Sequence, residues 1–381
     1  MKIANSHTAW CSFVLLVCPM VATAFSTGGG ANFFASAALN SSVSATDIAM
    51  PQKIAVTGAT GRTGALVVKE LLDRGVDVVA LVRDLSKAET SLPNDDDGSL
   101  TVIQCDLGSE KDIISTITSN DCDAAIWCAT GFSDNPQQTL IEKIQGIFGV
   151  AITPKQSIDA VGIPALAKCF QADDKDSNNT TPKVIMLSSA GVTRPSWSEE
   201  KKAMFEGSAD IPIVRLNPFN ILNIKADSEE RLRQSRVPYT IFRPTGLNDK
   251  WPAGARPIFS QGDVAVGRIN RADVAKILVD CLSTPDATGK TFEAFSLQGY
   301  PPAPSVSTAL SRLQKDSDGP LSDATLSCTY SAMQQLLPGE TQDAAALAMG
   351  QTYEQLDEGE TGRLGERGSE NAESAAPKPS S

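Results

Sequence analysis

Short apolar runs alternate with amphipathic stretches along the middle of the chain. The runs show no strict alternation of apolar and polar positions, which is typical of strands buried on both faces of a parallel sheet. We expect strands at residues 53–57, 77–82, 100–104, 124–128, 184–187 and 239–242. Between them, apolar positions recur at helical spacing, most clearly over residues 66–72, 111–118 and 226–234. Strands that alternate with helices need crossover connections and predict an α/β fold, a Rossmann-type doubly wound parallel sheet.

The N-terminal end of the chain has the pattern of targeting segments. Residues 1–24 read as a secretory signal peptide, with Lys2, an apolar stretch over residues 10–22 and small residues before a cleavage site after Ala24. A membrane span needs about 20 apolar residues, and this stretch is shorter. Residues 25–49 are rich in Ser, Ala and Gly and resemble a transit peptide. This order resembles the bipartite presequences of algae whose plastids have extra membranes, and it predicts the plastid stroma, with secretion as the alternative.

The rest of the chain, residues 50–381, divides into two parts that differ in composition. We expect one NAD(P)-type Rossmann domain over residues 50–299, with a small substrate-lid region towards its C-terminal end. Residues 300–381 are rich in Pro, Ser, Ala, Gln and Asp and predict a low-complexity acidic tail. Within this tail, residues 330–337 are apolar enough to form a short helix.

Charge and histidine content exclude several classes of function. The net charge is −12 and no block of Lys or Arg is present, which argues against a nucleic-acid partner. The one histidine, His7, lies in the predicted signal peptide, so the mature protein would contain none. Catalysis by Ser-His-Asp or Cys-His groups and histidine-ligated metal sites are therefore not expected, and we predict no metal site.

Cysteine usage bears on the compartment. Two of the eight cysteines, Cys11 and Cys18, leave with the predicted signal peptide. The others show no CxxC spacing and lie mostly in apolar runs, which indicates buried reduced thiols rather than the disulfide framework of a small secreted domain. This usage favours the stroma over secretion.

A glycine-rich loop follows the first predicted strand and opens the first predicted helix. Its sequence is Gly58-Ala59-Thr60-Gly61-Arg62-Thr63-Gly64. In such a loop the first glycine makes the tight turn, the second lets the backbone approach a pyrophosphate, and the third lets helix and strand pack closely. The helix N-terminus then presents N–H groups to the phosphates. Because the loop lies between a strand and a helix, it predicts a dinucleotide site that includes all these residues except Ala59.

Residues after the later strands indicate which dinucleotide is bound. A 2′-phosphate is usually held by an arginine after the second strand, and a 2′-hydroxyl by an acid. Arg83 comes first there, Asp84 follows it, and Arg62 is a second cation in the loop, so we expect NADP(H) rather than NAD(H). Ligands bind at the carboxyl ends of parallel strands, which adds Asp106 and Leu107 near the adenine. The same rule places Ala129, Thr130 and Gly131 near the riboses.

These residues resemble the atypical short-chain dehydrogenase/reductases, the NAD(P)H-binding or NmrA-like group, especially its plastid and cyanobacterial members. The resemblance spans about residues 53–296 and rests on the glycine loop and on residues 128–132, 187–191, 238–244, 271–275 and 290–293. It implies a Rossmann fold and a nicotinamide dinucleotide. It also implies that Pro244 lies by the nicotinamide and that Lys225 binds the nicotinamide ribose.

The catalytic residues of the classical enzymes are only partly present. Those enzymes use Tyr-x-x-x-Lys and a Ser, in which the Tyr exchanges a proton with the substrate carbonyl. None of the four tyrosines of this chain has a lysine four residues later. Lys225 matches the lysine of the motif, but Ile221 occupies the tyrosine position. The family serine corresponds to Ser188 or Ser189, and the sequence leaves this choice open.

Two functions are consistent with this pattern. The retained phosphate loop and the missing tyrosine favour an NADP(H)-binding protein that acts as a redox-gated binding or assembly factor for a plastid protein partner. The alternative is an NADPH-dependent oxidoreductase or isomerase for a small plastid metabolite, with Ser188, Ser189, water or the substrate as proton source. We expect no stable membrane span in the mature form.

Overall fold

The computed structural model describes residues 49–94, 97–131, 157–171, 181–209, 211–217, 220–303 and 305–336. The predicted signal peptide, the predicted transit-like segment apart from its last residue, and residues 337–381 of the predicted tail lie outside these ranges.

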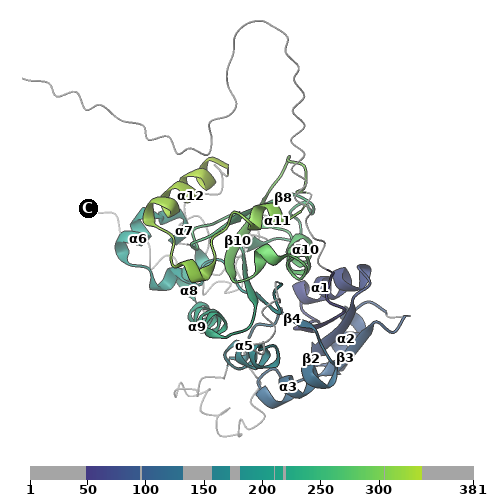
Figure 1. Cartoon of the computed structure of the whole chain (residues 1–381). Helices are drawn as coiled ribbons and strands as arrows, with labels where there is room; N and C mark the ends of the chain where they lie inside the picture. Colours follow the sequence, from purple (N-terminus) through teal and green to yellow (C-terminus); the bar gives the residue numbers. More distant parts are fainter. Residues whose placement is uncertain are drawn as a thin grey trace, which may run out of the picture. The chain divides into compact units, whose positions relative to one another are not determined.

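Within the described residues, one eight-stranded sheet has the strand order β3-β2-β1-β4-β5-β6-β10-β8 (Figure 1). Its strands are β1 (Lys53–Thr57), β2 (Asp77–Val82), β3 (Leu100–Gln104), β4 (Ala124–Trp127), β5 (Val184–Leu187), β6 (Tyr239–Pro244), β8 (Arg256–Ser260) and β10 (Lys290–Leu297). All neighbouring strands are parallel except β8, which runs antiparallel to β10. The order reverses between β1 and β4, which is the point at which open α/β sheets bind ligands beyond the carboxyl ends of their strands.

Alternate residues of the central strands contribute to two separate apolar layers. Ile54 and Val56 of β1 belong to the layer with α1 (Arg62–Asp73) and α10 (Arg271–Cys281). Ala55 belongs to the opposite layer, with α3 (Glu110–Ser119), α5 (Ile158–Cys169) and α9 (Ile221–Gln234). Because β1, β4 and β5 are buried along nearly their whole length, they need helices on both sides. This confirms the predicted doubly wound parallel sheet.

Further elements, most of them short, connect and extend these layers. They are α2 (Leu85–Ser91), η1 (Arg194–Ser196), α6 (Glu199–Met204), α7 (Glu206–Ala209), α8 (Pro212–Leu216), η3 (Pro285–Ala287), α11 (Ser307–Leu310), η4 (Asp316–Asp318) and α12 (Asp323–Leu336). A separate parallel pair joins β7 (Gly246–Leu247) to β9 (Arg268–Ile269). This pair brings the turn after β7 to the N-terminus of α10.

Folded structure continues past residue 299, where we predicted the domain to end. Leu326, Tyr330 and Met333 of α12 are buried in an apolar cluster with Phe205 and residues 264–266. The Tyr330 ring lies edge-on to Phe205 with centroids 5.2 Å apart, and its hydroxyl accepts a hydrogen bond from the backbone N–H of Gly207. The sequence indicated a short helix only from residue 330, because the buried apolar side chains of α12 are spaced four and three residues apart among polar ones.

Among the described residues, no helix has both the length and the apolar character needed to cross a bilayer.

The cysteines in the described ranges are free thiols, and burial raises the pKa of Cys128 to about 12. A thiol with so high a pKa is a poor nucleophile at neutral pH.

Candidate functional site

The predicted phosphate loop is a tight turn from β1 into α1. Gly58 has φ +65°, and the N–H of Gly61 donates to the carbonyl oxygen of Gly58 at 2.9 Å. A Cβ atom on Gly58 would lie 2.7 Å from the Cα of Ala129, and one on Gly64 would lie 2.2 Å from the Gly58 oxygen. Neither position has room for a side chain, so the loop packs closely on the end of β4 and on its own helix.

The N-terminus of α1 is open to an anion. Gly61 caps the helix without a side-chain hydrogen bond, and the first turn contains no acidic residue. Within the helix itself, no first-turn carboxylate neutralises the positive end of the dipole and the first N–H groups. Thr60 is half-buried in the loop and Thr63 is buried in the first turn. This cradle of backbone and glycine fits the diphosphate of a dinucleotide.

The two polar residues after β2 have different environments. Arg83 is exposed at the carboxyl end of the strand. Asp84 caps α2, because its carboxylate accepts hydrogen bonds from the backbone N–H groups of Ser86 at 2.9 Å and Lys87 at 3.3 Å. One oxygen of this carboxylate, Oδ1, therefore serves as the cap of α2.

The predicted residues after β3 and β4 lie at the same edge of the sheet. Asp106 is exposed and accepts a hydrogen bond from the N–H of Gly108 at 2.8 Å, while Leu107 packs against the apolar layer of α3 and α5. Ala129 is buried beneath Gly58, Thr130 is exposed, and the carbonyl of Gly131 accepts from the N–H of Ile158, the first residue of α5. Residues 129–131 follow β4 at the switch point, whereas Asp106 and Leu107 follow β3, the edge strand two positions from β1.

Lys225 is a buried cation with a buried partner. Its side chain is 8% exposed, and its Nζ lies 3.2 Å from Oδ1 of the fully buried Asp159 of α5. The same oxygen accepts a hydrogen bond from Nε1 of Trp127 at 3.0 Å. The other carboxylate oxygen of Asp159 has no hydrogen-bond partner. Lys225 is thus anchored to α5, one turn after Ile221 at the tyrosine position of the motif.

The two candidate serines differ in what they contact. Ser188 is buried, and its hydroxyl donates to Oε1 of Glu229 at 2.6 Å. Ser189 is half-buried, and its hydroxyl donates to the adjacent carbonyl of Ala190 at 3.0 Å. Pro244, at the end of β6, is buried and accepts the backbone N–H of Ala190 at 3.0 Å. Of the two hydroxyl groups, that of Ser189 is the one with solvent access.

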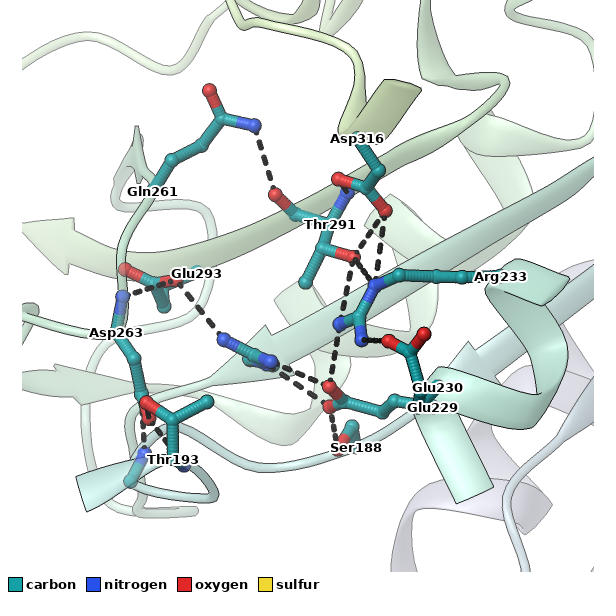
Figure 2. Close-up of polar contacts among 12 residues, drawn as sticks. Ser188, Thr193, Glu229, Glu230, Arg233, Gln261, Asp263, Thr291, Glu293 and Asp316 are labelled. Atoms are coloured by element: carbon teal, nitrogen blue, oxygen red, sulfur yellow. Dashed lines mark hydrogen bonds and ion pairs between the residues drawn. The ribbon is translucent and has the colours of Figure 1, made fainter. Parts of the chain in front are cut away.

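Glu229 is the centre of a buried charge cluster next to Ser188 (Figure 2). Its carboxylate accepts two hydrogen bonds from Arg243 of β6, at 2.9 and 2.5 Å, and a third from Arg233 at 2.8 Å. Burial, the largest single influence, would raise the pKa of Glu229, but the charges of Arg243 and Arg233 and the hydrogen bonds from Arg243 and Ser188 together hold the pKa below its ordinary value. The cluster ties α9 to the sheet with an ionised pair.

The cluster continues to a second buried acid. Nη1 of Arg243 lies 3.9 Å from Oε1 of Glu293 in β10, and that oxygen accepts the N–H of Asp263. Oε2 of Glu293 has no hydrogen-bond partner. Burial and the nearby charge of Asp263 raise the pKa of Glu293 to about 7. Asp263 itself accepts from the N–H of Gly191 and from Thr193, so the loop after β5 is held to β10 (Figure 2).

Part of the predicted substrate region is described. Trp251 is half-buried, with the guanidinium of Arg268 5.6 Å from the centre of its ring. A cavity of about 240 Å³ lies between α10, β8 and residues 302–306, and no residue predicted for the dinucleotide lines it. This cavity is therefore separate from the candidate site.

Sequence reasoning missed three acidic residues that contact candidate site residues: Asp159, Glu229 and Asp249. Glu229 follows Lys225 by four residues and so shares its helix face, which was a usable signal. Arg243, a charge inside the apolar β6, indicated that a buried acid must accompany it. Asp159 and Asp249 had no comparable signal, because their partners are distant in the sequence.

Comparisons with known proteins identify similar chains in plants. The chain is similar to an uncharacterised chloroplastic protein of Arabidopsis thaliana, 29% identical over 243 residues, with 64% of this chain and 76% of that protein covered. It is also similar to Protein TIC 62, chloroplastic, of the same plant, 29% identical over 207 residues, with 50% of this chain and 27% of that protein covered. The chain thus corresponds to about a quarter of that relative's length.

Among solved structures, the chain is similar to an NADP complex of a short-chain dehydrogenase/reductase from Veillonella parvula (TM-score 0.44, 17% identity, 65% and 96% of the two chains covered). It is also similar to ChuY, an anaerobillin reductase from Escherichia coli O157:H7 (TM-score 0.43, 19% identity, 65% and 99% covered). The NAD(P)H-binding family matches residues 58–285, more than half of the chain. The expected resemblance to the atypical, NmrA-like dehydrogenase/reductases is therefore confirmed, and the chain belongs to the NAD(P)H-binding family.

Proposed function

We propose that the chain binds NADP(H) through the residues predicted for the cofactor, and that its phosphate loop holds the diphosphate. The observation that carries this proposal is the loop itself: two glycines without room for a Cβ, before a helix N-terminus without an acidic first turn. The cofactor supplies hydride chemistry, and the chain supplies binding and orientation.

Gly61→Trp tests the loop. A tryptophan side chain at this position fills the space where a phosphate approaches the backbone, because even a Cβ there is 3.0 Å from the Gly58 oxygen. We expect calorimetric titration with NADPH to show no binding, while circular dichroism shows a folded chain. Affinity equal to that of the unmodified chain would disprove the site.

The choice of NADP(H) over NAD(H) rests on the end of β2. Arg83 is the exposed cation there, and Asp84 already caps α2. A carboxylate engaged by two backbone N–H groups is poorly placed to take a ribose hydroxyl as well. Arg83 is therefore the residue that we assign to the 2′-phosphate.

We propose that the protein acts through a redox-gated interaction with a protein partner rather than by classical carbonyl reduction. Ile221 has no proton to exchange, Lys225 is paired with Asp159, and the Ser188 hydroxyl is bonded to Glu229. A binding protein would distinguish NADPH from NADP⁺. Titration of both forms tests this: at least a several-fold difference in Kd supports the role, and equal affinities contradict it.

A reductase is the second candidate, and Ser189 is the observation that favours it. Its half-buried hydroxyl lies at the carboxyl end of β5, next to the residue that bonds to Pro244. NADPH consumption with a panel of aldehydes, ketones and conjugated carbonyls tests this candidate. Turnover that is lost in Ser189→Ala and kept in Ser188→Ala would support it.

We propose the plastid stroma as the location. The named chloroplastic relatives and the composition of residues 1–49 support it. A fusion of residues 1–49 to a fluorescent protein, expressed in an alga with a complex plastid, tests the proposal. Fluorescence in the medium would favour secretion instead.

A further inference from the structure

An acidic side chain sits between two arginines beside the phosphate loop. Asp249, in the turn after β7, forms ion pairs with Arg62, the first residue of α1, and with Arg271, the first residue of α10. The Arg271 Nη1 lies 2.6 Å from Oδ1 of Asp249. The side chain of Arg62 is 55% exposed, that of Asp249 41%, and that of Arg271 12%. The contact with Arg62 is thus the solvent-accessible half of the bridge.

The position of the Asp249 carboxylate is fixed by hydrogen bonds to the backbone of its turn as well as by its own ion pairs. Asn270 caps α10 through its oxygen, and its amide group donates to the carbonyls of Asp249 at 3.1 Å and Trp251 at 2.6 Å. The N–H of Lys250 donates to the Asn248 side chain at 2.8 Å. The turn is therefore fixed to the N-terminus of α10 independently of Arg62.

The carboxylate is ionised in this setting. Partial burial would raise the pKa of Asp249, but hydrogen bonds from Arg271 and Arg62 hold it below its ordinary value. A negative charge so close to Arg62 lowers the positive potential at the N-terminus of α1, where a phosphate group would bind. It also occupies the guanidinium that a phosphate would use.

We propose that Asp249 determines the affinity for the dinucleotide, as a built-in counter-ion that a dinucleotide phosphate displaces from Arg62. Displacement breaks the ion pair with Arg62 and leaves Asp249 bound to Arg271, so the turn after β7 stays on α10. The proposal rests on the proposed function, since it needs a dinucleotide in the phosphate loop. The group that displaces Asp249 from Arg62 is a phosphate, which belongs either to the diphosphate or to the 2′-phosphate of the dinucleotide.

Calorimetric titration of the full chain with NADP⁺ and NAD⁺ tests the proposal at low, fixed ionic strength. We expect Asp249→Asn to bind about three- to fivefold more tightly than the unmodified chain, the range that an exposed ion pair accounts for. A gain for both nucleotides identifies the diphosphate, and a gain for NADP⁺ alone identifies the 2′-phosphate. The matched control is Asp73→Asn, which removes an exposed carboxylate paired with Lys69 at the other end of α1 and should change neither affinity.

A double variant separates competition from a general charge effect. Arg62→Gln alone should bind more weakly, and adding Asp249→Asn to it should give no gain. Unchanged or weaker binding in Asp249→Asn, or a gain that persists without Arg62, would overturn the inference while the proposed function stands. Absence of nucleotide binding by the unmodified chain would overturn both.

Discussion

The two ends of the candidate site are built in opposite ways. At the phosphate loop, backbone and glycines from one continuous segment form the site, and its charges are exposed. Beneath Ser188, the polar groups are side chains from α9, β6, β10 and the loop at Asp263, and they are buried (Figure 2). The first region suits a ligand that enters and leaves. The second suits a fixed internal support, because a buried ion pair tolerates no missing partner.

If this contrast is correct, the largest effect on stability comes from Glu229→Ala. The substitution leaves Arg243 buried without its bidentate partner, and it should lower the free energy of unfolding by about 3–5 kcal/mol. Urea unfolding measures the change. The control is Glu230→Ala, because Glu230 also pairs with Arg233 but is 55% exposed and should contribute less than about 1 kcal/mol. Equal losses in the two variants would remove the distinction between a buried support and a solvated pair.

The next largest effect is a dependence of the free energy of unfolding on pH, which arises from Glu293. Its folded-state pKa is raised to about 7, so the neutral form stabilises the fold, and this stability is lost as the pH rises through 7. Because the unfolded-state pKa is the ordinary 4.5, the loss takes place between about pH 4.5 and 7, so Glu293→Gln should match the unmodified chain near pH 4 and exceed its free energy of unfolding by up to about 3 kcal/mol near pH 8.

Urea unfolding at the two pH values provides the measurement. Glu230→Gln is the control, because it removes an exposed carboxyl from the same region and should leave the pH profile parallel to that of the unmodified chain. If Glu293→Gln is also parallel, Glu293 does not titrate in this range.

A smaller effect, confined to binding, is expected at the ligand end. Arg83→Ala should weaken NADPH binding about tenfold, equivalent to about 1.4 kcal/mol, and should leave NADH binding and the unfolding free energy unchanged. Calorimetric titration of both nucleotides checks this. Equal losses for NADPH and NADH would mean that Arg83 does not contact the 2′-phosphate. A large decrease in the free energy of unfolding of Arg83→Ala would show that this end of the site also supports the fold.

The sequence alone was sufficient for the features that neighbouring residues determine. Strands β1 to β6, the first helix and the glycine loop are local patterns, since burial on both faces and a tight strand-to-helix turn need particular residues in consecutive positions, whereas β7 to β10 were not predicted. The missing catalytic tyrosine is equally visible, because the motif it belongs to has fixed spacing.

Only the tertiary structure decided which side chains are already engaged. The pairing of Lys225 with Asp159 joins residues 66 positions apart, and that of Arg62 with Asp249 joins residues 187 apart. The assignment of Ser188 to Glu229 and the packing of α12 after residue 299 depend on the same kind of contact. The physical reason is that a charge or an apolar face must be satisfied when it is buried, but the chain topology selects which distant residue satisfies it.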